Sequence, residues 1–131
     1  MPGWAMEVQD AFKSFPFEAP FSFSVQTTKY GEWGSVNWIR KELESRGLED
    51  VKVEVFAFLS HVDSPDFFLS NIGVMVDWVV KSNWSEELQK AHGRDEYREL
   101  LREHLVKKYE GGGWDQSWVA IVSSGRVPLA A

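Results

Sequence analysis

The spacing of apolar residues changes several times along the chain, and each change predicts a new element. Over the first 15 residues apolar side chains recur at helical spacing, until Pro16 ends the run. Residues 21–28 then alternate apolar and polar side chains, which predicts a half-buried strand. A second helix is predicted after Ser35, whose hydroxyl is placed to cap it, and Gly47 is placed to end it in a left-handed conformation.

The middle of the chain predicts a strand followed by a long helix. Residues 51–58 have the composition of a strand whose two faces are both partly covered. Ser64, Pro65 and Asp66 match a helix start, with a capping hydroxyl, a proline at the first position and a carboxylate near the positive end of the helix dipole. An apolar stripe follows at helical spacing, which predicts a core-facing surface: Phe68, Ile72, Met75, Val76 and Val79.

The carboxyl-terminal half predicts two further helices and a last strand. Ser85 is placed to begin a short helix that Gly93 ends, and Asp95 to begin a longer one. On one face of the longer helix His104 is expected to be a packed histidine, because no second ligand stands beside it at metal-binding spacing. After a turn of three glycines at 111–113, residues 114–124 predict a strand that is apolar on both faces around 118–122. We expect such a strand to lie inside a sheet.

Composition narrows the class of protein. A chain of 131 residues with 44% apolar residues is long enough for a single domain, which we predict over 1–131. A net charge of −6 disfavours nucleic-acid binding. The lack of cysteine excludes disulfides and thiolate catalysis and fits a reducing compartment, and no apolar run approaches the length of a membrane span. We therefore expect a soluble, cytoplasmic protein that binds neither nucleic acid nor membrane, and we expect no metal.

The stretch "SHVDSPDFF" contains the candidate chemistry. Helix capping accounts for Ser64, Pro65 and Asp66, but it does not account for His61 and Asp63. These two follow a strand, and the carboxyl ends of strands are where open α/β sheets hold their ligands. For His61 and Asp63, a role as an acid/base pair and the absence of any functional role both remain open.

Three longer stretches carry a resemblance: "SVNWIRKELESRGLEDVKVEVFAF", "DSPDFFLSNIGVMVDWVVKSNWSEE" and "WDQSWVAIVSSGRVP". Together they resemble the carboxyl-terminal part of fungal class I S-adenosylmethionine-dependent small-molecule methyltransferases. The resemblance implies an antiparallel pair formed by strands 51–58 and 114–124, with the helical insert covering the substrate. The predicted fold class is α+β, a small antiparallel sheet packed against several helices as in a methyltransferase carboxyl-terminal subdomain.

The cofactor-binding half of that family has no counterpart here. The family builds its cofactor site on a glycine-rich turn after the first strand and an acidic residue after the second. The glycines at 111–113 are no substitute, because they precede a strand and do not lead into a helix amino terminus. We therefore predict no cofactor and no binding of S-adenosylmethionine.

Three interpretations of function follow. The first is a cofactor-independent cyclase or isomerase that acts on an apolar polyketide-type intermediate, for example by lactone or pyrone closure, through acid/base and shape control. His61 would be the base, Asp63 would assist it, and Tyr30 or Lys29 would stabilise the enolate. The substrate pocket would be lined by six aromatic residues: Trp33, Trp38, Phe67, Phe68, Trp78 and Trp84. The alternatives are a non-catalytic binding or partner subunit derived from a methyltransferase, and an excised methyltransferase fragment.

Assembly follows from the missing half of the sheet. A strand at 114–124 without its second neighbour would leave unpaired backbone groups beside an apolar face. We predict a homodimer that extends the sheet, with Phe21, Phe23, Trp118 and residues 119–122 at or near the joint.

Overall fold

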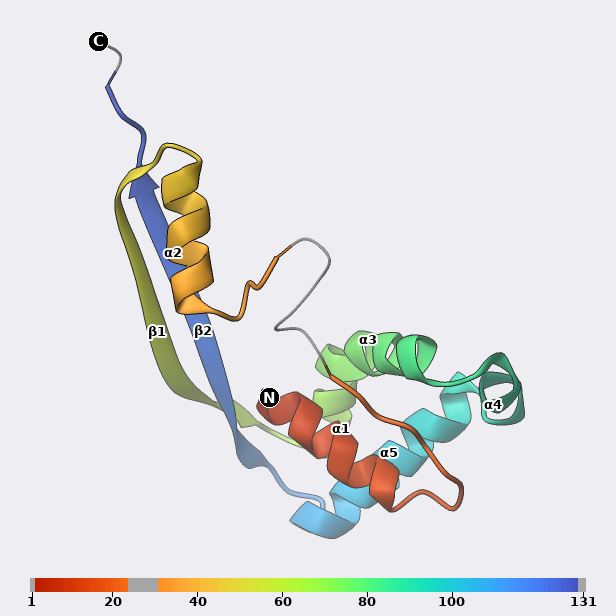
Figure 1. Ribbon diagram of the computed structural model, residues 1–131. Coiled ribbons are helices and arrows are strands. Elements are labelled where there is room, and N and C mark those ends of the chain that lie inside the picture. Colours follow the sequence, from red (N-terminus) through yellow and green to blue (C-terminus); the bar gives the residue numbers. More distant parts are fainter. Residues whose placement is uncertain (1, 24–30, 130–131) are drawn as a thin grey trace. The chain divides into compact units, whose positions relative to one another are not determined.

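The computed structural model describes residues 2–23 and 31–129 and has an α+β fold (Figure 1). This part of the chain contains five helices and two long antiparallel strands. In chain order the elements are α1 (Gly3–Lys13), α2 (Val36–Ser45), β1 (Glu49–Val62), α3 (Pro65–Asn83), α4 (Glu86–Ala91), α5 (Arg94–Tyr109) and β2 (Trp114–Arg126). The two strands are neighbours in a two-stranded sheet. The connection between them is not a hairpin, because α3, α4 and α5 intervene.

The chain divides into two compact units, which we describe separately. The helical unit contains residues 1–23 and 59–118, and the ribbon unit contains residues 24–58 and 119–131. Each strand contributes one end to the helical unit and the other end to the ribbon unit.

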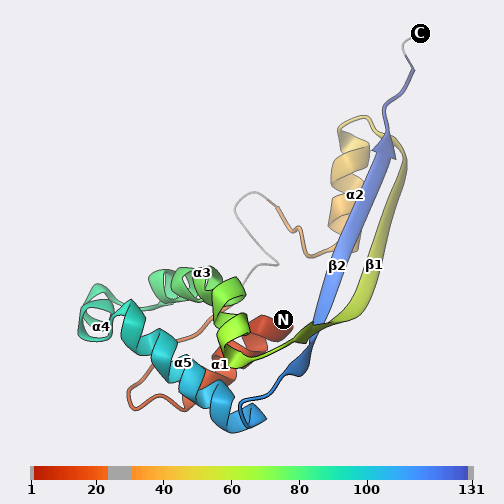
Figure 2. The same ribbon diagram turned by 180° about the vertical axis from the view of Figure 1, so that it is seen from behind.

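The helical unit holds the hydrophobic core. Helix α5 lies beside both α1 and α3 in the two opposite views (Figures 1 and 2). Its buried residues have the spacing of one helical face: Tyr97, Leu101 and Leu105. Helix α3 buries its predicted stripe except at Met75, which is 39% exposed. The largest fully buried side chains all belong to this unit: Trp4, Phe68, Leu101, Leu105, Val8, Val76 and Val79.

Polar contacts around Asp77 join α3 to α5. Asp77 of α3 accepts hydrogen bonds from the Tyr97 hydroxyl and from the Arg98 guanidinium of α5. Gly73, one turn earlier, leaves room for this arginine, since a Cβ there would lie 3.1 Å from the Arg98 Cζ. Gly73 therefore allows the close approach of a guanidinium group.

In the ribbon unit, α2 lies alongside the ends of the two strands (Figure 1). Ile39 is buried, and the Arg40 guanidinium donates a hydrogen bond to the carbonyl oxygen of Val51 in β1. Arg126 at the end of β2 contacts both Glu49 and Asp50 of β1, at 2.8 and 3.0 Å. These contacts join the outer ends of the two antiparallel strands.

The three predicted serine caps and the predicted glycine end of α2 are confirmed, whereas α5 begins at Arg94, one residue before the predicted Asp95. Ser35, Ser64 and Ser85 each accept a hydrogen bond from a backbone N–H in the first turn of the helix that follows. Gly47 has the predicted left-handed conformation, with φ +90°.

Two strand predictions need correction. Strand β1 continues four residues past Phe58, so that His61 lies on the strand rather than after it. In the predicted strand at 21–28, residues 21–23 have no regular structure and residues 24–30 lie outside the described residues. Phe21 and Phe23 pack against Phe12 and Trp4 of α1, with ring centroids 6.0 and 5.3 Å apart. A dimer joint at Phe21 and Phe23 would therefore have to displace contacts inside their own unit.

Much of the apolar surface of β1 and β2 is exposed. In the ribbon unit Val55, Phe56, Phe58, Val119 and Val122 are each about half exposed or more, between 49% and 65%. Strand β2 has a single neighbour, β1, in the described sheet, although its sequence predicted an interior strand. Among the helices that the structure describes, none has the length and apolar character needed to cross a membrane.

Candidate functional site

The imidazole of His61 lies between two carboxylates. Its Nδ1 is 3.0 Å from Oδ1 of Asp115, and its Nε2 is 3.7 Å from Oδ1 of Asp63. His61 is the penultimate residue of β1, Asp115 the second residue of β2, and Asp63 the first residue after β1. Antiparallel pairing of the end of β1 with the start of β2 brings His61 and Asp115 together.

Asp115 was not among the sequence-predicted residues. It is 54 positions from His61 and belongs to no motif. The predicted strand pair nonetheless contained a signal for this contact. If the last residues of one strand pair with the first residues of the other, the side chains of His61 and Asp115 lie opposite each other.

Gly113 makes the close packing around His61 possible. A Cβ at this position would lie 3.0 Å from the His61 Nε2 and 2.4 Å from the carbonyl oxygen of Val62. The last residue of the glycine turn is therefore required for close approach to the end of β1, a role that differs from cradling a phosphate.

The hydrogen bond to Asp115 favours one tautomer of His61. A carboxylate accepts, so Nδ1 carries the proton and Nε2 keeps its lone pair. That arrangement is the one a histidine general base requires, with the carboxylate orienting the ring and stabilising the imidazolium. The His61 side chain is 62% exposed, so that it is accessible but also well hydrated. No cluster of three potential metal ligands occurs within 2–23 and 31–129.

The six aromatic residues predicted to line a pocket have different environments. Phe68 and Trp84 are core residues, 1% and 4% exposed, and the Trp84 indole N–H donates a hydrogen bond to the carbonyl oxygen of Pro20. Phe67 and Trp78, both on α3, are 45% and 50% exposed. Burial against core neighbours makes Phe68 and Trp84 structural residues, while Phe67 and Trp78 are accessible to a ligand.

Trp33 and Trp38, the remaining two aromatic residues, belong to the ribbon unit. Trp33 and Trp38 contact each other edge to face, with centroids 4.9 Å apart. Lys29 and Tyr30, the residues predicted to stabilise an enolate, lie outside the described residues.

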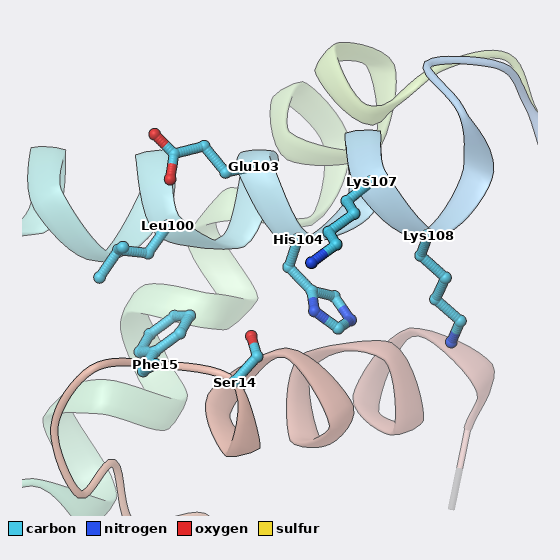
Figure 3. Close-up of a pocket in the computed structure, with 7 residues that line it drawn as sticks. All are labelled: Ser14, Phe15, Leu100, Glu103, His104, Lys107 and Lys108. Atoms are coloured by element: carbon cyan, nitrogen blue, oxygen red, sulfur yellow. The ribbon is translucent and has the colours of Figure 1, made fainter.

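A hollow lies between the end of α1 and the side of α5, and sequence reasoning missed it (Figure 3). Its volume is about 590 Å³. It is lined by Ser14 and Phe15 on one side and by Leu100, Glu103, His104, Lys107 and Lys108 of α5 on the other. We call it the α1–α5 groove. Helix periodicity places His104 and Lys108 on one face of α5, but only packing of α1 against α5 brings Ser14 and Phe15 opposite them.

Charges at one end of this groove are already paired. The Lys108 ammonium is 3.0 Å from Glu7 and 3.1 Å from Asp10, and the His104 Nε2 is 3.3 Å from Asp10. The hydrogen bond from Lys108 lowers the pKa of Asp10 below its usual value. The prediction that His104 is a packed histidine with its polar atoms satisfied agrees with its contact to Asp10 and its 17% exposed side chain.

No family model matches the chain.

Proposed function

We propose that the chain is a cofactor-independent cyclase or isomerase that acts on an apolar, polyketide-type intermediate, with His61 as the general base. The observation that carries this proposal is the 3.0 Å contact between His61 Nδ1 and Asp115 Oδ1. It orients an accessible imidazole with its Nε2 lone pair available, and a second carboxylate, Asp63, lies near that nitrogen. This assignment replaces Asp63 with Asp115 as the residue that orients the base.

The chemistry requires only proton movement. His61 Nε2 removes a proton from a carbon between two carbonyl groups, which produces an enolate and an imidazolium. The enolate oxygen attacks the carbonyl carbon of a thioester further along the same chain and forms the ring bond. The carbon–sulfur bond breaks, and the thiolate takes the proton from the imidazolium, so that His61 returns to its starting state. Asp63 and Asp115 stabilise the imidazolium between the two transfers.

The apolar nature of the substrate is supported by the surface beside the base. Leu59 lies two residues before His61 on β1, so both side chains project from the same face of the strand, and Leu59 is 68% exposed. Phe67, at the start of α3, adds an exposed ring within the same helical unit. Apolar side chains beside a few polar groups are the usual composition of a small-molecule site.

The test uses a 3,5-diketohexanoyl thioester of N-acetylcysteamine, which releases a thiol and forms a pyrone when it cyclises. We expect His61→Gln to remove the rate above background and Asp115→Asn to reduce kcat at least tenfold, because the amide no longer favours the proton on Nδ1. Asp50→Asn is the matched control, since Asp50 is also an exposed strand-end aspartate but pairs with Arg126. Equal rates for His61→Gln and the unsubstituted protein would remove His61 as the base.

A second candidate is a non-catalytic partner or homodimeric subunit, and the exposed ribbon favours it. The ribbon unit presents the apolar side chains of Phe56, Val119 and Val122 on two strands without further neighbours in the described sheet. A second copy or another chain that extended this sheet would cover them. In a homodimer, Trp118 and residues 119–122 would lie at or near the joint, without Phe21 and Phe23. Light scattering at rising micromolar concentration tests the dimer, which a persistent monomer mass would contradict.

A further inference from the structure

We propose that the α1–α5 groove binds a small carboxylic acid with an apolar body, and that the Lys107 ammonium contacts its carboxylate. This site shares no residue with the His61 cluster. Ligand binding in the groove can therefore be tested independently of the proposed enzymatic function.

The size and the walls of the groove suit an apolar body. A volume of about 590 Å³ lies within the range of roughly 300–1,000 Å³ that is typical of small-molecule sites. Phe15 and Leu100 supply the apolar surface from opposite sides, one from the segment after α1 and one from α5 (Figure 3). Phe15 is 8% exposed and packs against Phe12, with ring centroids 5.1 Å apart, so this wall is already in place before a ligand binds.

The charges of the groove indicate an anion. Lys108 is neutralised by Glu7 and Asp10, which lie at the same end of the helix pair. Lys107 differs, because it forms no ion pair with any residue in the described part of the chain. An ammonium group beside apolar walls, without a carboxylate of its own, is placed to bind a carboxylate from a ligand.

Glu103 also lines the groove, and its carboxylate would repel a bound anion. The orientation of this side chain limits the repulsion. Figure 3 shows its carboxylate directed away from α1, whereas the Lys107 ammonium extends toward the His104 side of the groove. The charged groups that face the ligand position are therefore Lys107 and the pairs formed by Asp10 with His104 and Lys108. One unpaired cation favours a ligand with a single anionic group.

The experiment is an NMR titration of the full chain with decanoate, followed through backbone amide shifts. We expect the largest shifts at Ser14, Leu100 and Lys107. Lys107→Gln should weaken binding about tenfold, because it removes a charge-assisted contact. Lys90→Gln on α4, which removes an exposed lysine of the same helical unit outside the groove, is the matched control and should leave the affinity unchanged.

Two further ligands make the outcome decisive. Decanol, which has the apolar body without the charge, should bind the unsubstituted protein about as weakly as decanoate binds Lys107→Gln. Inorganic phosphate, which has charge without an apolar body, should not saturate the groove. The proposal is overturned if Lys107→Gln binds decanoate as well as the unsubstituted protein does, if decanoate shifts only β1 and β2 residues, or if no saturable binding occurs.

Discussion

Gly113 and His61 are so close that a side chain on the glycine would press against the imidazole. A Cβ on Gly113 would lie 3.0 Å from His61 Nε2, 2.9 Å from the carbonyl oxygen of Asp63 and 2.4 Å from that of Val62. The glycine turn before β2 thus shapes the surroundings of His61.

Gly113→Ala is expected to lower the free energy of unfolding by about 1–3 kcal/mol, because two of the colliding atoms are backbone oxygens that cannot move independently. It should also move the His61 ring away from Asp115. Urea unfolding and the imidazole NMR signals measure the two effects. Gly112→Ala is the matched control, since its Cβ would meet only the Tyr109 carbonyl oxygen, at 3.4 Å. Equal stability of the two variants would contradict the close approach.

Trp84 and Trp78 provide a comparison between a core and a surface tryptophan. Trp84 is 4% exposed and contacts Phe12, Phe17 and Tyr97, whereas Trp78 is 50% exposed. We expect Trp84→Ala to lower the free energy of unfolding by about 3–5 kcal/mol and Trp78→Ala by less than about 1 kcal/mol. Chemical denaturation measures both. A small effect of Trp84→Ala would show that this residue lines an open site, as the sequence suggested.

The raised pKa of Tyr109 predicts that the folded protein loses stability at alkaline pH. Burial and a hydrogen bond donated to Glu7 raise its pKa to about 12, above the ordinary value of 10.0. The folded state favours the neutral phenol. The contribution of Tyr109 to the free energy of unfolding is therefore fully present below pH 10 and is lost as the pH rises toward 12. Tyr109→Phe should therefore reduce the slope of stability against pH in this window and cost about 1 kcal/mol at neutral pH.

Urea unfolding at pH 7, 10 and 11 measures that slope. Tyr97, whose pKa is also raised by burial and by its hydrogen bond to Asp77, leaves a residual slope in the Tyr109→Phe variant. The interpretation fails if the substitution leaves the alkaline slope unchanged.

Ser64→Ala tests the side-chain cap at the start of α3. The Ser64 Oγ accepts a hydrogen bond from the Phe67 N–H at 3.1 Å, so its removal should lower the free energy of unfolding by about 1 kcal/mol. Ser64→Asp retains an acceptor and should keep most of the stability. Thermal unfolding compares the two, and identical loss in both variants would mean that the hydroxyl contributes in some way other than capping.

The sequence by itself determined the helix starts and the faces of the helices. Ser35, Ser64 and Ser85 begin helices as predicted, because a cap depends on atoms three residues away. The stripe of α3 predicted four of its core residues, since helical periodicity places them on one side.

Only the tertiary structure decided which side chains meet. Asp115 reaches His61 across 54 positions, and Ser14 faces His104 across the groove, because strand pairing and helix packing depend on the whole chain at once. The burial of Trp84 and the exposure of Trp78 have the same cause. Both are tryptophans near one end of α3, and the core formed by α1 and α5 lies against only one of them. Local patterns carry no information about which neighbour occupies a face, so the candidate site depended on the fold.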